Sequence, residues 1–175
     1  MEPLRLWEKQ FLQRQLTIFL IKVNKDKKVS SILTGVSGEY FAAAELSRRG
    51  HIASITLRNT KGIDIVASSE DGSKTINIQV KTSSKNTKGW MLNKKAETMK
   101  DENMFYIFVK LNDLEEGPEF HIVPTSHVAK KVRKEHQEWL NTPGRGGVKR
   151  KDTDMRKFED NNNKYKDEWH LLELD

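Results

Sequence analysis

Hydrophobic and polar residues alternate one by one over several short stretches in the middle of the chain, and this period of two is typical of β-strands. The clearest stretch is Thr75–Lys81, where isoleucine and valine alternate with asparagine, glutamine and lysine. Residues 91–100 fit a short helix or a loop. The predicted strands are, in chain order, His51–Arg58, Gly62–Ser68, Lys74–Thr82, Met104–Lys110 and Glu119–Val123.

Helical patterns flank these strands on both sides. The first predicted helix is Gly38–Arg49, with Ser37 as its N-cap and Gly50 as the residue that ends it. The second begins at Thr125 or Ser126 and is amphipathic. Its apolar face is formed by Val128, Val132, His136, Trp139 and Leu140. A helix, a set of strands joined by hairpins and a second helix predict one α/β domain with a mixed central sheet flanked by helices.

The N-terminal segment differs from this pattern. Apolar residues from Leu4 to Leu12 recur at helical spacing, and the charged run Lys25–Lys28 follows as a linker. We therefore predict an N-terminal appendage or helix over residues 1–29 and a domain over residues 30–175.

The amino-acid composition excludes several kinds of protein and of functional site. The chain has 175 residues and no cysteine, which excludes disulfides, thiolate nucleophiles and cysteine-ligated zinc. Its five histidines lack the spacing of helical zinc ligands. No apolar run approaches eighteen residues, so we expect no membrane span, no membrane partner and a cytoplasmic location.

The net charge of +6 is concentrated in one segment. Pro124–Lys151 contains eight lysines and arginines against two acids, so this segment carries the whole surplus. Such a block suits neutralisation of nucleic-acid phosphates, although a solvated helix face followed by a mobile loop has the same composition. The candidate nucleic-acid-binding residues are Lys130, Lys131, Arg133, Lys134, Arg145, Lys149, Arg150 and Lys151, with Ser83, Lys85 and Lys88 beside the third predicted strand.

The candidate catalytic residues are predicted mainly on the second and third strands. Asp71-Gly72 between them is typical of a two-residue type I′ hairpin turn. With this turn, paired residues have numbers that sum to 143, so Asp64 lies opposite Gln79 and Gly62 lies opposite Lys81. Opposed residues share a face of the sheet. The sequence therefore predicts a carboxylate, an amide and an ammonium on one patch.

This pattern, Gly62-Ile63-Asp64-Ile65-Val66 followed by Ile78-Gln79-Val80-Lys81, resembles the core of the PD-(D/E)XK nuclease superfamily in its Gln-for-Glu form. Glu39, near the start of the first predicted helix, is similar to the helical acid of Holliday-junction resolvase-like members. The resemblance covers about residues 37–123. It implies a restriction-endonuclease-like core, metal-dependent hydrolysis of phosphodiester bonds, and DNA as the substrate, and it allows a homodimer.

The resemblance also implies the role of each site residue. Glu39, Asp64 and Gln79 would hold Mg²⁺, or Mn²⁺ in its place, with the Val80 carbonyl as a further ligand. Lys81 would orient or deprotonate the attacking water and balance charge on the phosphorane. We expect the four catalytic residues to be Glu39, Asp64, Gln79 and Lys81.

One departure keeps a second function open. Gln79 stands where most members have an acid, which removes one negative charge from the site. The alternative is a catalytically inactive module of the same fold that binds nucleic acid or a protein partner. A basic block that serves only as a protein-interaction surface is a third possibility.

Overall fold

The computed structural model describes residues 5–7, 9–15, 29–57 and 62–175. The chain separates into two compact units, Met1–Ser30 and Ser31–Asp175. In the first unit, most of the described residues are helical, and Leu6, Trp7, Phe11 and Leu12 are exposed. The linker predicted at Lys25–Lys28 lies outside the described residues.

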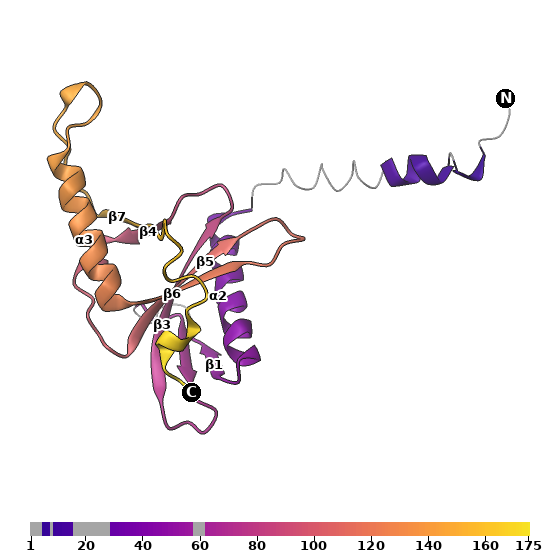
Figure 1. The fold of residues 1–175 in the computed structure, drawn as a ribbon, viewed down its shortest axis with the longest axis horizontal. Coiled ribbons are helices and arrows are strands. Elements are labelled where there is room, and N and C mark those ends of the chain that lie inside the picture. Colours follow the sequence, from indigo (N-terminus) through magenta and orange to yellow (C-terminus); the bar gives the residue numbers. More distant parts are fainter. Residues whose placement is uncertain (1–4, 8, 16–28, 58–61) are drawn as a thin grey trace. The chain divides into compact units, whose positions relative to one another are not determined.

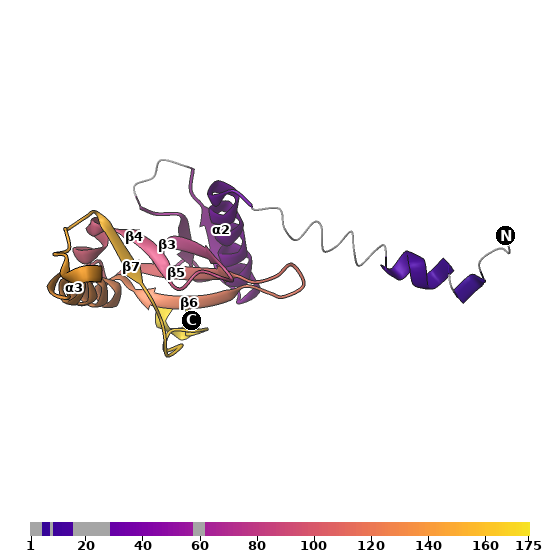
Figure 2. The same ribbon diagram turned by 90° about the horizontal axis from the view of Figure 1, so that it is seen from above.

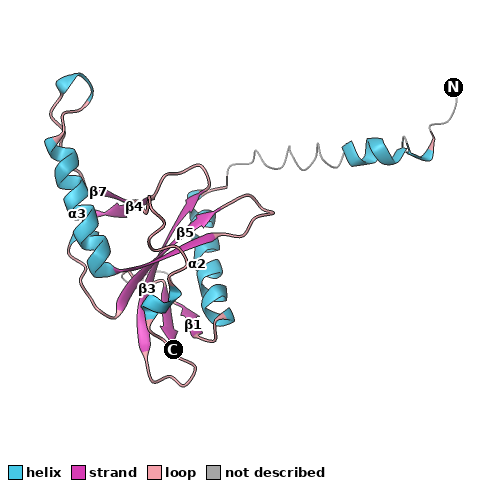
Figure 3. Cartoon of the chain, viewed as in Figure 1, coloured by secondary structure: helices cyan, strands magenta, loops and turns pink. Residues whose placement is uncertain are grey.

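The second unit is built on a five-stranded mixed sheet in the order β1-β2-β3-β5-β6 (Figure 1). Its strands are β1 (Ile52–Ile55), β2 (Ile65–Ser68), β3 (Thr75–Ser84), β5 (Met104–Leu111) and β6 (Glu119–Pro124). The β3–β5 pair is parallel, and the other neighbours in this sheet are antiparallel. The prediction of an α/β domain with a mixed central sheet flanked by helices is confirmed (Figure 3).

The two faces of the sheet carry two hydrophobic cores. One core joins Ile78 and Val80 of β3 to Ala42 and Leu46 of helix α2 (Ser31–Arg48). On the other face, Tyr106 and Phe108 of β5 pack with helix α3 (Thr125–Asn141) and with a two-stranded sheet of β4 (Trp90–Asn93) and β7 (Met155–Phe158). Figure 2 shows α3, β4 and β7 together at one end of the domain.

Helix α2 begins seven residues earlier than predicted. Ser37 is not its N-cap, because it lies inside the helix, where its hydroxyl donates to the Leu33 carbonyl at 2.8 Å. A serine inside a helix often satisfies its hydroxyl in this way, so the residue type alone misplaced the start. The helix ends at Arg48, one residue before the predicted end, and Gly50 terminates it as predicted, since Gly50 has φ +92° and its N–H donates to the Ser47 carbonyl.

The β2–β3 hairpin has the predicted register but a different turn. Ile65 pairs with Ile78, and the pairs through Ser68 and Thr75 continue the sum of 143. The turn is not type I′, because Asp71 lacks the positive φ that this turn requires. Its carboxylate instead accepts hydrogen bonds, first from the backbone N–H of Ser73, then from hydroxyl groups, which lowers the pKa of Asp71 to about 2.

Other elements were only partly predicted. Residues 91–100 prove to be most of β4 followed by the 3₁₀ helix η1 (Lys94–Glu97), and β7 was not predicted. A further 3₁₀ helix, η2 (Arg145–Gly147), follows α3, and η3 (Trp169–Leu172) lies near the C-terminus. In the described part of the chain, no helix is both long and apolar enough to cross a membrane.

Candidate functional site

The candidate site lies where β2 and β3 separate. The paired part of β2 begins at Ile65, whereas β3 continues to Ser84. Asp64 directly precedes β2 and bridges this point: its N–H donates to the Ile78 carbonyl at 2.8 Å, and its Oδ2 accepts from the Val80 N–H at 2.7 Å. The carboxylate thus bonds a β3 backbone group just beyond the last cross-strand pair. We call Gly62, Asp64, Gln79, Val80 and Lys81 the β2–β3 fork.

The fork brings Asp64 to Gln79, although not by the predicted pairing. Because the ladder ends at Ile65, Asp64 instead bonds to the backbone on both sides of Gln79. Gly62 does not lie opposite Lys81. A Cβ added to Gly62 would be 3.8 Å from Nε2 of Gln79, so the glycine lies beside the amide.

The side chains of Gln79 and Lys81 emerge on one face of β3. They are half-buried, and they pair in register with Tyr106 and Phe108 of β5. Burial and, to a smaller extent, the nearby Asp64 carboxylate together raise the pKa of Tyr106 to about 12. Asp64 is therefore electrostatically coupled to the face that carries Gln79 and Lys81.

The polar side chains of the fork have few partners. Among the described residues, the Asp64 carboxylate accepts from the Val80 N–H alone, Gln79 has no side-chain hydrogen bond, and Lys81 has no ion pair. The buried hydroxyl of Ser83, two residues beyond Lys81, also has no hydrogen-bond partner. Half-buried polar groups that lack hydrogen-bond partners within the protein are suited to binding a polar ligand.

Glu39 belongs to helix α2, which lies on the other face of the sheet. Helix α2 packs on the sheet face that carries Val80 and Thr82, opposite to the Lys81 side chain. The contact is closest at Gly38, where an added Cβ would be 1.9 Å from Thr82 Oγ1. Glu39 is half-buried directly beside this contact. Its place in the catalytic group stays a prediction, which requires its side chain to reach the open edge of β3.

Acidic and histidine side chains do not form a larger cluster here. Within residues 5–7, 9–15, 29–57 and 62–175, no three His, Cys, Asp or Glu side chains gather in a way that could hold a metal ion. Any metal at the fork would therefore also need amide or backbone oxygens as ligands.

The predicted nucleic-acid-binding residues fall into two groups. Some are engaged within the protein. Lys85 pairs with Asp113 at 2.9 Å and with Glu116, and these acids raise the pKa of Lys85. Lys131 pairs with Glu135, Lys134 lies 3.8 Å from Glu138, Arg133 donates to the Glu97 carbonyl, and Arg150 lies over the Trp139 ring.

The second group is exposed. Lys88, Lys130, Arg145, Lys149 and Lys151 have no ion pair with another described residue. Four of them belong to α3 or to the loop that follows it, and this part of the chain runs away from the sheet (Figure 1).

A groove of about 670 Å³ runs along α3. One wall is the exposed helix face, and the other includes Glu97 and Lys100. Three residues of this lining were not predicted from the sequence, namely Lys100, Gln137 and Asn141. The helical spacing of Gln137 and Asn141 relative to Lys130 and Lys134 could have indicated the shared face.

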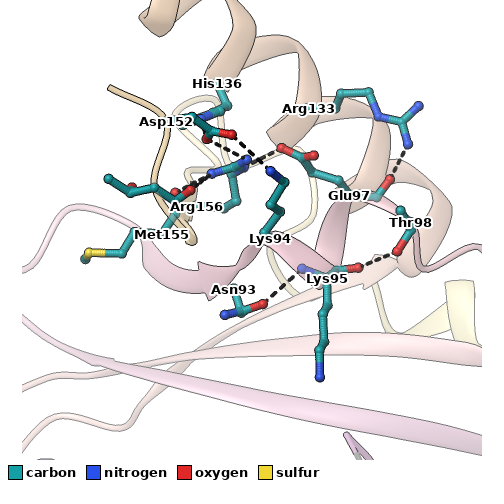
Figure 4. A network of polar contacts seen from close by, with 11 residues as sticks. Asn93, Lys94, Lys95, Glu97, Thr98, Arg133, His136, Asp152, Met155 and Arg156 are labelled. Carbon is teal, nitrogen blue, oxygen red and sulfur yellow. Dashed lines mark hydrogen bonds and ion pairs between the residues drawn. The ribbon is translucent and has the colours of Figure 1, made fainter. Parts of the chain in front are cut away.

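A second polar cluster ties the C-terminal segment to the domain (Figure 4). Arg156 of β7 is 3% exposed and donates to Glu97 and, at 3.2 Å, to Asp152. Asp152 also accepts from Lys94 at 3.0 Å and contacts Nε2 of His136 at 2.8 Å. Lys94 and then His136 hold the pKa of Asp152 well below its usual range. We call these five residues the Arg156 network.

Comparison with known proteins gives a likeness in structure but none in sequence. No protein-family model matches the chain, and no curated protein matches it. The fold is similar to that of a bacterial homing endonuclease, I-Ssp6803I, with a TM-score of 0.48 and 19% sequence identity. The match covers 83% of this chain and 94% of that chain.

Proposed function

We propose that this chain is a metal-dependent endonuclease that hydrolyses phosphodiester bonds in DNA, in the Gln form of the PD-(D/E)XK superfamily. One observation carries the proposal: Asp64 bonds to the backbone on both sides of Gln79, at the point where β2 and β3 separate. Lys81 follows on the same face of β3. This supports the arrangement expected from the sequence pattern.

The donor set suits a hard divalent cation. The fork offers the Asp64 carboxylate, the Gln79 amide oxygen and the Val80 carbonyl, and Glu39 of α2 would add a second carboxylate. Mg²⁺ prefers oxygen ligands and needs only one or two carboxylates from the protein. Bound there, Mg²⁺ or Mn²⁺ would supply the positive charge that activates a water molecule and offsets the charge of the phosphate.

The chain's own residues would perform the remaining tasks. The Val80 N–H fixes the orientation of the Asp64 carboxylate. The Lys81 ammonium would orient the attacking water and stabilise the negative charge that develops on the phosphorane. Gln79 would contribute an oxygen without charge, so the cation is held less tightly than it would be by a glutamate.

A plasmid-cleavage assay tests the proposal. Supercoiled and linear DNA are incubated with Mg²⁺, with Mn²⁺ or with a chelator. We expect cleavage only with metal, and a rate at least about a hundredfold lower in Asp64→Asn and in Lys81→Ala. Glu70→Gln and Lys74→Ala, at the far end of the same hairpin, are matched controls that should cut normally. Undiminished cleavage by Asp64→Asn and Lys81→Ala would overturn the assigned roles.

Gln79→Glu sharpens the same test. The variant restores the usual acid, so we expect the Mg²⁺ concentration for half-maximal cleavage to fall about tenfold. A requirement that stays the same or rises would show that the Gln79 side chain is not a metal ligand.

A second candidate function is a module of the same fold that binds nucleic acid without cutting it. The lack of a three-acid cluster in the described residues favours it. Calorimetric titration with Mn²⁺ separates the two functions. Heat of binding that is lost in Asp64→Asn supports the nuclease, whereas no binding supports the non-cutting module.

A further inference from the structure

The exposed surface of α3 has two sides of different character. One side lines the groove and has helical spacing throughout. Besides Ala129 and one acid, Glu138, it consists of six residues that carry donors or amides, namely Ser126, Lys130, Arg133, Lys134, Gln137 and Asn141. We call these six residues the α3 groove face.

The other exposed side of α3 is electrically balanced. Lys131 and Glu135 form an ion pair one turn apart, and Glu138 lies at the border with the groove face. The positive charge of α3 is therefore directed mainly into the groove, although lysines occur all round the helix.

The opposite wall of the groove adds positive charge. Lys100 lines it, whereas the carboxylate of Glu97 is bound to Arg156. The Glu97 carbonyl accepts from Nη2 of Arg133, which holds this guanidinium at the groove (Figure 4). The lining therefore contains four positive side chains, those of Lys100, Lys130, Arg133 and Lys134. Of its two acids, Glu97 is neutralised by the buried Arg156, and Glu138 has no buried partner.

We propose that the α3 groove face enters the major groove of duplex DNA and reads its sequence. This inference rests on the proposed function, because it takes DNA as the substrate. Lys100, Lys130 and Arg133 would contact phosphates, and Gln137 and Asn141 would reach base edges. Glutamine and asparagine pair with two atoms of adenine there, which gives preference for particular bases.

The dimensions favour duplex DNA over duplex RNA. An α-helix with its side chains is about 10–12 Å wide, and the major groove of B-DNA is about 12 Å wide. The 17 residues of α3 are long enough to follow the groove. The major groove of A-form RNA is too narrow for side chains to read.

Binding measurements without metal test the phosphate contacts, because they do not depend on cleavage. Fluorescence anisotropy with a random-sequence 30-base-pair duplex is measured in chelator over a range of salt concentrations. We expect Lys130→Ala to weaken binding about tenfold at low salt and to reduce the salt slope by about one. Lys131→Ala removes the same charge from the adjacent position and should have a smaller effect. Lys164→Ala, an exposed lysine outside α3, should bind as the unaltered chain does.

Selection from a randomised duplex library tests the base contacts. The unaltered chain and Asp64→Asn should select the same preferred sequence, and Gln137→Ala and Asn141→Ala should lose preference at one or two positions while affinity for random duplex is kept. Equal effects of Lys130→Ala and Lys131→Ala, unchanged selection by the amide variants, or equal competition by duplex RNA would overturn the inference. If the chain cleaves DNA but gives any of these results, the proposed function holds and this inference fails. If the chain binds DNA as expected but does not cleave it, this inference holds and the proposed function fails.

Discussion

The β2–β3 fork and the Arg156 network are both built from charged and amide side chains, but they differ in how those groups are partnered. In the network, Arg156 is buried and donates to Glu97 and Asp152, and Asp152 is also held by Lys94 and His136. Each charge there faces an opposite one.

At the fork, the same kinds of group are left open. Asp64 accepts from Val80, and within the described residues Lys81 has no ion pair and Gln79 no side-chain hydrogen bond. A buried network with complete partners stabilises the arrangement of the chain, whereas half-buried groups without partners are disposed to bind something else. Charge alone therefore does not distinguish the two regions, whereas the lack of internal partners does.

The largest effect should come from Arg156→Met. Removing the buried guanidinium leaves the Glu97 carboxylate without its partner, and we expect the free energy of unfolding to fall by about 3–5 kcal/mol. Urea denaturation measures this value. Lys81→Met, the corresponding change at the fork, should alter it by less than about 1 kcal/mol and still abolish cleavage. Equal losses of stability would show that the fork is as structural as the network.

Gly38→Ala should have the next largest effect. Its methyl group would be 1.9 Å from Thr82 Oγ1, so α2 must move away from β3, at a cost of about 1–3 kcal/mol. Gly35→Ala in the same helix has no atom within 4 Å of its added Cβ and should stabilise the domain by up to about 1 kcal/mol. Thermal and urea unfolding check both variants, and opposite signs are the required result. If Glu39 acts at the fork, cleavage by Gly38→Ala should fall more than the stability loss explains.

The smallest expected effect is on the stability of the domain at low pH. The pKa of Asp152 is lowered in the folded state, so its contribution to stability is present above the usual value of 3.8 and is lost as the pH falls below it. Asp152→Asn should therefore lower the melting temperature at pH 6 and reduce the further decrease between pH 6 and pH 3. Asp71, whose pKa is about 2, should show the same trend in Asp71→Asn. A steeper acid dependence in either variant would contradict the assignment.

Local signals predicted the elements near the fork well. Alternation placed β3, and the Asp71-Gly72 hairpin set a register that Ile65 and Ile78 confirm, even though the turn type was wrong. The register survives because the buried isoleucines must face the core, and a slip of one residue would expose them. No local signal of this kind marks the residue at which the pairing of β2 with β3 ends, so the predicted position of Gly62, opposite Lys81, was wrong.

Pairs that join distant parts of the chain could not be predicted in this way. β4 and β7 pair through Trp90 and Phe158, and neither strand carries a mark of its partner in the local pattern. The same is true of Glu97 and Arg156, which are 59 positions apart. Long-range contacts of this kind are chosen by packing of the whole core.

By itself, the sequence determined the α/β class, the phase of the strands and the residues that share the fork, because these follow from periodicity and from one short hairpin. The tertiary structure decided which charges are neutralised within the protein and which are left open. Lys85 and Lys130 look alike in the sequence, yet one is paired with Asp113 and Glu116 and the other lines an open groove. That difference depends on which distant segments lie nearby in space, and the folding of the complete domain sets it.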